Sequence, residues 1–178
     1  LDNKIDLILE LPFVFGSQSA DTFAYYSIKI LNNFGIDKVI FGSECNDLNK
    51  LKEITYKTKE GSYNKLVKEY LSQGVNYPTA LAKALNTDFE FLPNDLLGIS
   101  YLKAIDEINP TIEVETIKRT NNYHDLTSNE EVISASNIRN KLYNNENITT
   151  YIPNYDSSSI RIPNKELTTK SLLLFLRI

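Results

Sequence analysis

The sequence contains no methionine and no tryptophan, and it has one cysteine and one histidine among its 178 residues. A single cysteine cannot form an intramolecular disulfide, and one cysteine with one histidine cannot supply a His/Cys zinc cluster. Disulfide-stabilised folds and zinc modules of these kinds are therefore excluded. The longest apolar run, at residues 172–176, is far shorter than the roughly 20 residues that a membrane-spanning helix needs. We expect no membrane-spanning helix.

The chain also lacks an excess of positive charge, because 19 Lys and Arg stand against 23 Asp and Glu, for a net charge of −4. This balance argues against a globally basic nucleic-acid binder but leaves room for a local basic patch. The missing methionine is informative as well. A translated chain begins with methionine, whose removal normally requires a small second residue, and Leu1 is not small. We therefore expect the chain to be a fragment of a longer protein.

The first 44 residues have the pattern of strand, helix and strand. A short apolar run at 4–12, ended by a proline, predicts a buried parallel strand. Helical spacing follows over 19–35, with Ser19 as the predicted N-cap and Gly35 just after the last turn. A second buried strand is predicted at 38–44. Short connections of this kind are typical of a βαβ unit with parallel strands.

The rest of the chain is mostly helical, with one further strand. Apolar stripes and Gly/Pro punctuation predict three helices within 47–87 and another that starts at 93–95 and stops before Pro110. Strict alternation at 112–117 predicts a third strand, half exposed or near a sheet edge. A last short helix is predicted at 134–142. Together these elements predict an α/β fold.

Two segments are candidates for contacts with a nucleotide. Gly42 follows the second predicted strand, and in open α/β sheets ligands bind at the carboxyl ends of the strands. A glycine there lets a ligand approach the backbone, although it also serves simply to turn the chain. Asn94 and Asp95 lie at a predicted helix start, where an Asn either caps the helix or contacts a ligand.

A third candidate is the start of the last predicted helix. Ser134, Ser136 and Arg139 place hydroxyl groups, free backbone N–H groups and a guanidinium near one helix N-terminus. Such a terminus binds anions, and arginine adds a fork-shaped phosphate donor. The alternative is a capped helix with a solvated arginine.

Other reactive residues give weaker signals. Arg119 lies at the end of the third predicted strand, and His124 and Asp125 follow it, but no serine motif accompanies them, so hydrolysis by a Ser-His-Asp triad is disfavoured. Cys45 has no activating base nearby in the sequence, which favours a small, partly buried residue over a nucleophile. Two glutamates, Glu10 and Glu44, end predicted strands and could organise a cation or a partner, or simply accept hydrogen bonds from backbone N–H groups.

Several segments, taken in order, resemble the bacterial tRNA(Met) cytidine acetate ligases. The similarity lies in a D-L-x-x-E-L-P block with an A-x-x-F-A segment after it, an F-G-S-E turn, a P-N-x-x-L-G helix start, an R-x-x-x-x-Y-H-D segment and an I-S-A-x-x-I-R segment. They occur at residues 6–12, 20–24, 41–44, 93–98, 119–125 and 133–139. No single motif is specific, but their common order extends over nearly residues 1–143.

The resemblance implies a Rossmann-like nucleotidyltransferase fold, a parallel sheet flanked by helices that is incomplete at the N-terminus. It implies a partial catalytic domain at 1–143, and a linker with the start of a helical C-terminal domain at 144–178. It also implies that ATP binds at Gly42, Asn94 and Arg119, with Ser134, Ser136 and Arg139 near the phosphates. Magnesium, if it takes part, is expected to be held mainly by the phosphates, with no metal ligand assigned in this chain.

The family's activity, carried over with the resemblance, is that of a cytoplasmic ligase with two steps. ATP converts acetate to acetyl-adenylate, and the acetyl group then passes to N4 of the wobble cytidine of elongator tRNA(Met). No catalytic residue is assigned, because the family's H-x-G-H signature and its Q-R-G segment do not occur in this sequence. We therefore expect this chain alone to be inactive. Two alternatives remain: another adenylyltransferase, such as a pantetheine-phosphate or nicotinamide-mononucleotide enzyme, and a non-catalytic nucleotide- or RNA-binding scaffold.

Overall fold

The computed structural model describes residues 5–119, 127 and 132–152. The chain divides into two compact units, one formed by residues 9–119 and the other by residues 1–8 together with 120–178. No helix within the described residues is long and apolar enough to cross a membrane, which agrees with the expectation from the sequence.

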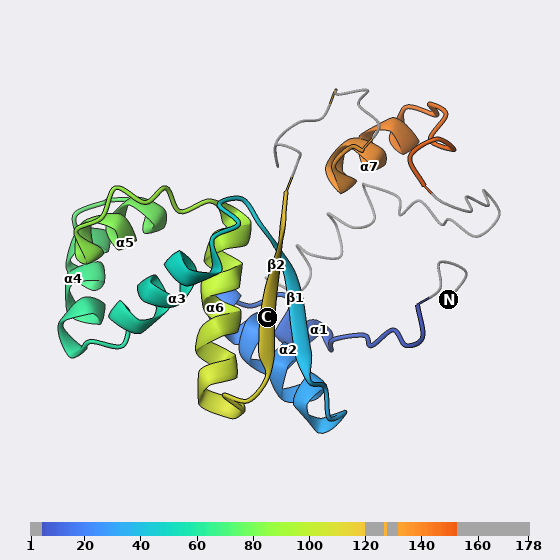
Figure 1. Ribbon diagram of the computed structural model, residues 1–178. Helices are drawn as coiled ribbons and strands as arrows, with labels where there is room; N and C mark the ends of the chain where they lie inside the picture. The colour runs from blue at the N-terminus through green and yellow to red at the C-terminus, as the bar shows by residue number, and fades with distance from the viewer. Residues whose placement is uncertain (1–4, 120–126, 128–131, 153–178) are drawn as a thin grey trace. The chain divides into compact units, whose positions relative to one another are not determined.

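The unit of residues 9–119 is an α/β structure with two strands and six helices within its described residues (Figure 1). In chain order these elements are α1 Phe13–Gly16, α2 Ala20–Asn33, β1 Lys38–Ser43, α3 Leu48–Lys57, α4 Gly61–Ser72, α5 Tyr77–Leu85, α6 Pro93–Ile108 and β2 Glu113–Lys118.

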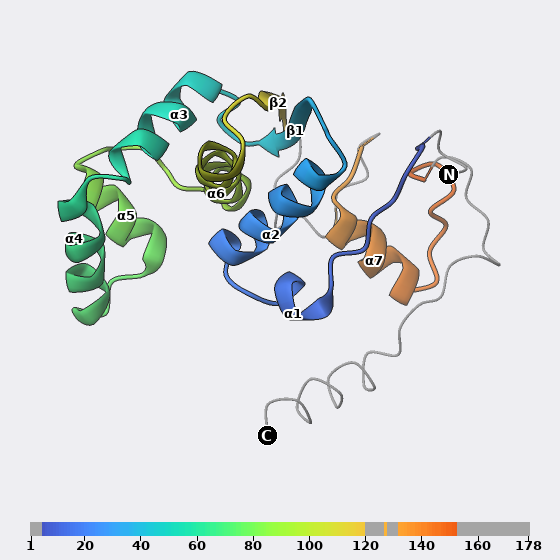
Figure 2. The same cartoon turned by 90° about the horizontal axis from the view of Figure 1, so that it is seen from below.

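The two strands pair in parallel, with Val39 opposite Val114 and Gly42 opposite Ile117. Helices α2 and α6 lie on the same side of this sheet, and α3 lies beside α6 (Figure 2). The side chains of β1 alternate accordingly, because Val39, Phe41 and Ser43 are buried whereas the residues between them are exposed. Of the two strands, β2 is the more exposed, as predicted for the strand at 112–117.

Local signals in the sequence set the helix ends. The side chains of Ser19, Asp47 and Asn76 each accept a hydrogen bond from the backbone N–H three residues later, which caps α2, α3 and α5. Gly35 and Gly74 follow α2 and α4 with φ of 68° and 82°, a left-handed conformation that glycine adopts at low cost. The helices predicted over 19–35 and within 47–87 are confirmed.

The strand predicted at 4–12 is wrong for the residues that the structure describes. Residues 5–11 are in no strand, and Leu7 and Ile8 are 57% and 67% exposed. An apolar run becomes a strand only where a neighbouring backbone completes its hydrogen bonds, and β2 is the only partner of β1 among the described residues. The parallel pair is therefore β1 with β2, connected through α3–α6, and the predicted βαβ unit of residues 4–44 does not form.

Gly98 of α6 packs closely against the sheet. A Cβ atom added there would lie 2.5 Å from Cε2 of the buried Phe41 ring. We expect Gly98→Ala to lower the free energy of unfolding by about 1–3 kcal/mol, because overpacking outweighs the roughly 1 kcal/mol that alanine adds in a helix. Thermal unfolding measures this change.

Gly61 provides the matched control, because it opens α4 and a Cβ atom there would meet nothing within 4 Å. We expect Gly61→Ala to leave the free energy of unfolding unchanged or slightly raised. Equal destabilisation by both substitutions would show that the contact between Gly98 and Phe41 is not as tight as described.

In the unit of residues 1–8 and 120–178, the described structure centres on α7, Ala135–Tyr143. Ser134 is its N-cap and accepts a hydrogen bond from the N–H of Asn137 at 3.0 Å, so the predicted helix at 134–142 is confirmed. Lys141 is buried and pairs with Glu146 at 3.2 Å. The predicted boundary at residue 144 stays a prediction, and the predicted segment at 171–178 lies outside the described residues.

Candidate nucleotide-binding site

The carboxyl end of β1 meets the N-terminus of α6 through Glu44. The Glu44 carboxylate accepts hydrogen bonds from the backbone N–H of Asn94 at 3.2 Å and of Asp95 at 2.9 Å, and from the Asn94 side-chain amide at 2.5 Å. The N-cap residue of α6, Leu92, offers no side-chain acceptor. Glu44 therefore satisfies the helix N-terminus from outside the helix, where negative charge is also favoured by the helix dipole.

Asp95 returns the same kind of interaction to the turn after β1. Its carboxylate accepts hydrogen bonds from the Ser43 hydroxyl at 2.5 Å, from the N–H of Glu44 at 3.1 Å and from the N–H of Cys45 at 3.1 Å. Asp95 is 1% exposed and Ser43 is fully buried. Glu44 at the strand end thus accepts hydrogen bonds from the helix start, and Asp95 at the helix start accepts them from the strand end. These reciprocal hydrogen bonds hold the carboxyl end of β1 against the N-terminus of α6.

Arg119 completes the group from the end of β2. Its backbone N–H donates to the carbonyl of Ser43 at 2.9 Å, which continues the sheet pairing by one residue. Its Nη1 donates to the Asn94 side-chain oxygen at 3.4 Å, and its Nε is buried with no hydrogen-bond partner among the described residues. A half-buried guanidinium with unused donors is suited to bind a phosphate or a carboxylate.

Gly42 lies directly beneath the Arg119 side chain. A Cβ atom added at Gly42 would be 3.5 Å from Cγ of Arg119 and 3.8 Å from its Cδ. Gly42 belongs to the exposed face of β1, opposite the face that α6 covers. The absence of a side chain therefore leaves backbone accessible beside the arginine, at the end of the strand where α/β proteins bind ligands. We name Gly42, Glu44, Asn94, Asp95 and Arg119 the strand-end cluster.

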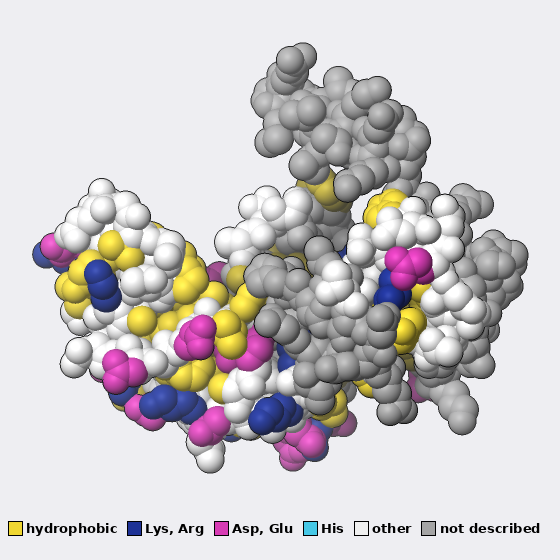
Figure 3. All heavy atoms as spheres, turned by 90° about the horizontal axis from the view of Figure 1, so that it is seen from above, with side chains coloured by type: hydrophobic (Ala, Val, Ile, Leu, Met, Phe, Trp, Pro, Cys, Tyr) yellow, Lys and Arg dark blue, Asp and Glu magenta, His cyan; other side chains and the backbone are white. Residues whose placement is uncertain are grey.

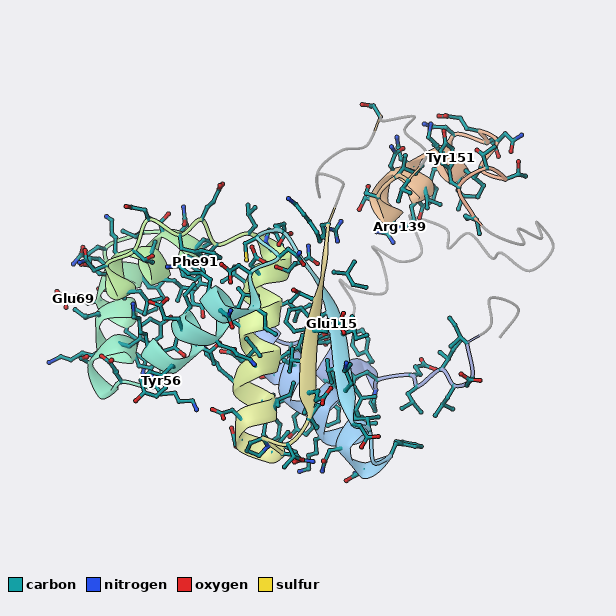
Figure 4. The ribbon with its side chains drawn as sticks, in the orientation of Figure 1. Tyr56, Glu69, Phe91, Glu115, Arg139 and Tyr151 are labelled. Atoms are coloured by element: carbon teal, nitrogen blue, oxygen red, sulfur yellow. The ribbon has the colours of Figure 1, made fainter. Side chains whose placement is uncertain are left out.

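The structure brings together three of the six residues that the sequence singled out, Gly42, Asn94 and Arg119. Ser134, Ser136 and Arg139 belong to the unit that contains α7, where Arg139 is labelled in Figure 4. There the Ser134 hydroxyl caps the helix and the Ser136 hydroxyl accepts from Nη2 of Arg139 at 3.2 Å. A role for these three residues near phosphates stays a prediction.

The interpretation of Asn94 or Asp95 as the cap of α6 is wrong. Pro93 occupies the first helical position, which its fixed φ favours, so the N-cap falls on Leu92 and both polar residues lie inside the first turn. Of the alternatives for Glu44, acceptance of backbone N–H groups is the one observed. The sequence held a signal for this contact, because a helix that starts with Leu-Pro lacks its own capping side chain.

Of the remaining candidates that the structure describes, only Cys45 contacts the cluster, through its backbone N–H, which donates to Asp95. Glu10 is exposed and in no strand. His124 and Asp125 lie outside the described residues. Cys45 is partly buried, and burial is the main cause that raises the pKa of its thiol above the ordinary value. The thiolate form of Cys45 is therefore disfavoured, in line with the expectation that it is not a nucleophile.

No three His, Cys, Asp or Glu side chains gather to hold a metal ion in the part of the chain that the structure describes. The two carboxylates of the strand-end cluster are occupied by backbone and side-chain donors. These two carboxylates therefore hold the strand end against the helix start, and no metal ligand is assigned to them.

Comparison with known proteins agrees with this geometry. Residues 1–177 match the family model described as HIGH Nucleotidyl Transferase. A tRNA(Met) cytidine acetate ligase of Mycoplasma mobile is 40% identical over 158 residues, which cover 86% of this chain and 53% of the relative. A ligase of the same name from Bacillus mycoides is 36% identical over 164 residues, which cover 85% of this chain and 42% of the relative. The chain thus spans about half the length of the relatives, or less.

Two solved structures share the fold. Thermotoga maritima TmcAL in its apo form matches with a TM-score of 0.73 and 28% identity, over 84% of this chain and 40% of that one. The same protein bound with alpha-thio ATP matches with a TM-score of 0.63 and 29% identity, over 79% of this chain and 36% of that one. The predicted resemblance and the nucleotidyltransferase fold are confirmed, and the chain belongs to the HIGH nucleotidyl transferase family.

Proposed function

We propose that the full-length protein is a tRNA(Met) cytidine acetate ligase and that the strand-end cluster binds its ATP. The observation that carries the proposal is the meeting of Gly42, Asn94 and Arg119, residues 25 to 77 positions apart, beside an unused guanidinium donor. Relatives of this name and an ATP-analogue complex of a structural neighbour support it. Elongator tRNA(Met) and acetate are the proposed further substrates, and a cytoplasmic location follows from the tRNA substrate.

The proposed chemistry has two transfers. An acetate oxygen attacks the α-phosphorus of ATP, the bond from that phosphorus to the pyrophosphate oxygen breaks, and pyrophosphate leaves. The N4 amine of the wobble cytidine then attacks the acetyl carbonyl, AMP leaves with the bridging oxygen, and the amine loses one proton. Arg119 would stabilise charge that develops on the phosphate oxygens, and Gly42 would let the nucleotide approach the backbone.

The first transfer can be tested without RNA. The full-length protein is expected to exchange labelled pyrophosphate into ATP only when acetate is present, and to acetylate tRNA(Met) in a second assay. Exchange that depends on a phosphorylated small molecule in place of acetate would support another adenylyltransferase. Binding of ATP without any exchange would support a non-catalytic scaffold.

A further inference from the structure

A pocket lies along α6, and none of the residues of the strand-end cluster lines it. This cavity of about 490 Å³ is formed by the start of α2, the middle of α6 and the lobe of α3–α5. Hydrophobic side chains gather where this lobe meets the rest of the unit (Figure 3). We name it the aromatic pocket, because three rings line it: Tyr63 of α4, Tyr77 of α5 and Phe91, which lies between α5 and α6. Phe91 is labelled in Figure 4.

Tyr63 supplies a polar group to the wall of the aromatic pocket. Its side chain is only 6% exposed, its hydroxyl makes none of the described hydrogen bonds, and the oxygen is not a fully buried atom, so it is open to the cavity. Burial, followed by the nearby Tyr77 and Asp21, raises the pKa of Tyr63 well above its usual range. The group therefore stays a neutral hydroxyl, able both to donate and to accept. A hydroxyl that is open to the cavity is available to form a hydrogen bond with a molecule that enters it.

Asp21, Ser100 and Lys103 form the polar side of the same pocket. Oδ1 of Asp21 accepts from the Ser100 hydroxyl at 2.6 Å and lies 3.8 Å from Nζ of Lys103. Oδ2 of Asp21 makes none of the described hydrogen bonds, which leaves it as a free acceptor. Lys103 is partly exposed, so its ammonium group can reach an anion outside the cavity.

We propose that the aromatic pocket binds an unpaired nucleobase that carries an exocyclic amino group, supplied by the RNA substrate. Splayed-out bases stack on aromatic side chains, as the three rings allow. A carboxylate accepts from an exocyclic amino group, and a hydroxyl satisfies a ring nitrogen or carbonyl oxygen. Lys103 would contact the neighbouring phosphate. The assignment of the source to RNA rests on the proposed function.

The pocket is separate from the strand-end cluster but shares a helix turn with it. Pro93 and Leu96 line the pocket, whereas Asn94 and Asp95, on the same turn of α6, belong to the cluster. A loop of RNA with one base in the pocket would therefore lie beside the turn that holds the proposed ATP contacts. The pocket would position the loop, and the cluster would serve the chemistry.

The test measures binding of 5′-mononucleotides to the full-length protein by saturation-transfer NMR. Uracil lacks the exocyclic amino group, so CMP is expected to bind at least five-fold more tightly than UMP. Asp21→Asn is expected to reduce this preference, and Tyr63→Phe to weaken CMP binding about five- to ten-fold, the effect of one hydrogen bond. Tyr56→Phe is the matched control, because Tyr56 is 73% exposed and lies outside this pocket.

An RNA competition arm identifies the source of the base. A transcript of tRNA(Met) is expected to displace CMP from the pocket, and this displacement is expected to fail in Tyr63→Phe at matched concentrations. Equal binding of CMP and UMP, or equal effects of Tyr63→Phe and Tyr56→Phe, would overturn the pocket assignment. Binding of CMP that RNA cannot displace would overturn the RNA assignment. Acetate-dependent exchange by the wild-type protein needs no RNA, so it reports separately on the proposed function.

Discussion

Arg119→Ala in the full-length protein is expected to lower kcat/KM for ATP in acetate-dependent exchange by about 100-fold or more. The reason is that a pre-placed donor to developing phosphate charge typically contributes about 10²–10³-fold to a rate. Within the described residues, Nε of Arg119 is buried without a partner and Nη1 donates to Asn94 at 3.4 Å, so the guanidinium is positioned and keeps unused donors. Arg119→Lys is expected to recover only part of the loss, because lysine lacks the planar fork.

Lys118→Ala is the control for this prediction. Lys118 is the adjacent cation, ends β2 and is exposed, and its substitution removes the same unit of charge. We expect little change in kcat/KM for ATP with Lys118→Ala. The backbone N–H of Arg119 that pairs with Ser43 remains in the alanine variant, so the fold should be retained. Equal rates for Arg119→Ala and the wild type would remove Arg119 from the ATP site.

Asp95→Ala is expected to lower the free energy of unfolding by about 3 kcal/mol or more. The carboxylate is 1% exposed and accepts from one hydroxyl and two backbone N–H groups. Each hydrogen bond to a charged group contributes about 1.5–3 kcal/mol, and a buried donor left without an acceptor costs about 1–3 kcal/mol. Asp95→Asn keeps one acceptor oxygen and should cost less. Thermal and urea unfolding of the full-length protein measure both variants.

Asp88→Ala is the matched control, because Asp88 is exposed in the connection between α5 and α6 and makes none of the described hydrogen bonds. A change within about 0.5 kcal/mol is expected for such a surface position. Similar decreases in the free energy of unfolding for Asp88→Ala and Asp95→Ala would contradict the reciprocal hydrogen bonds of Glu44 and Asp95. Loss of ATP use with full stability in Asp95→Ala would also contradict them, since the structure gives Asp95 a supporting role.

The helices could be predicted because their signals are local. Ser19 caps α2, Gly35 and Gly74 adopt the left-handed conformation after their helices, and each signal lies within a few residues of the element it defines. The strand predicted at 4–12 failed for the opposite reason. Whether an apolar run pairs depends on which backbone lies beside it, and a run of hydrophobic residues carries no information about that neighbour.

In the candidate site, too, local sequence signals could be predicted and contacts between distant residues could not. Gly42 and Asn94 are predicted as nucleotide contacts from their positions at a strand end and a helix start, and the resemblance adds Arg119. The structure groups the three residues. The hydrogen bonds by which Glu44 and Asp95 hold these residues in place were not predicted, because they join residues about 50 positions apart. Only Leu92 hinted at them, as a helix start without its own cap. Hydrogen bonds of this kind become visible when the fold brings a strand end against a helix start.

A crystal structure of the full-length protein with alpha-thio ATP is the most direct test of the strand-end cluster. We expect the nucleotide at the carboxyl end of β1, against the backbone of Gly42, with Asn94 and the Arg119 guanidinium in hydrogen-bond contact. We also expect the aromatic pocket to stay free of this nucleotide at concentrations that saturate the cluster. A nucleotide bound elsewhere, with Arg119 and Asn94 arranged as in the free protein, would show that the strand-end cluster is not the ATP site.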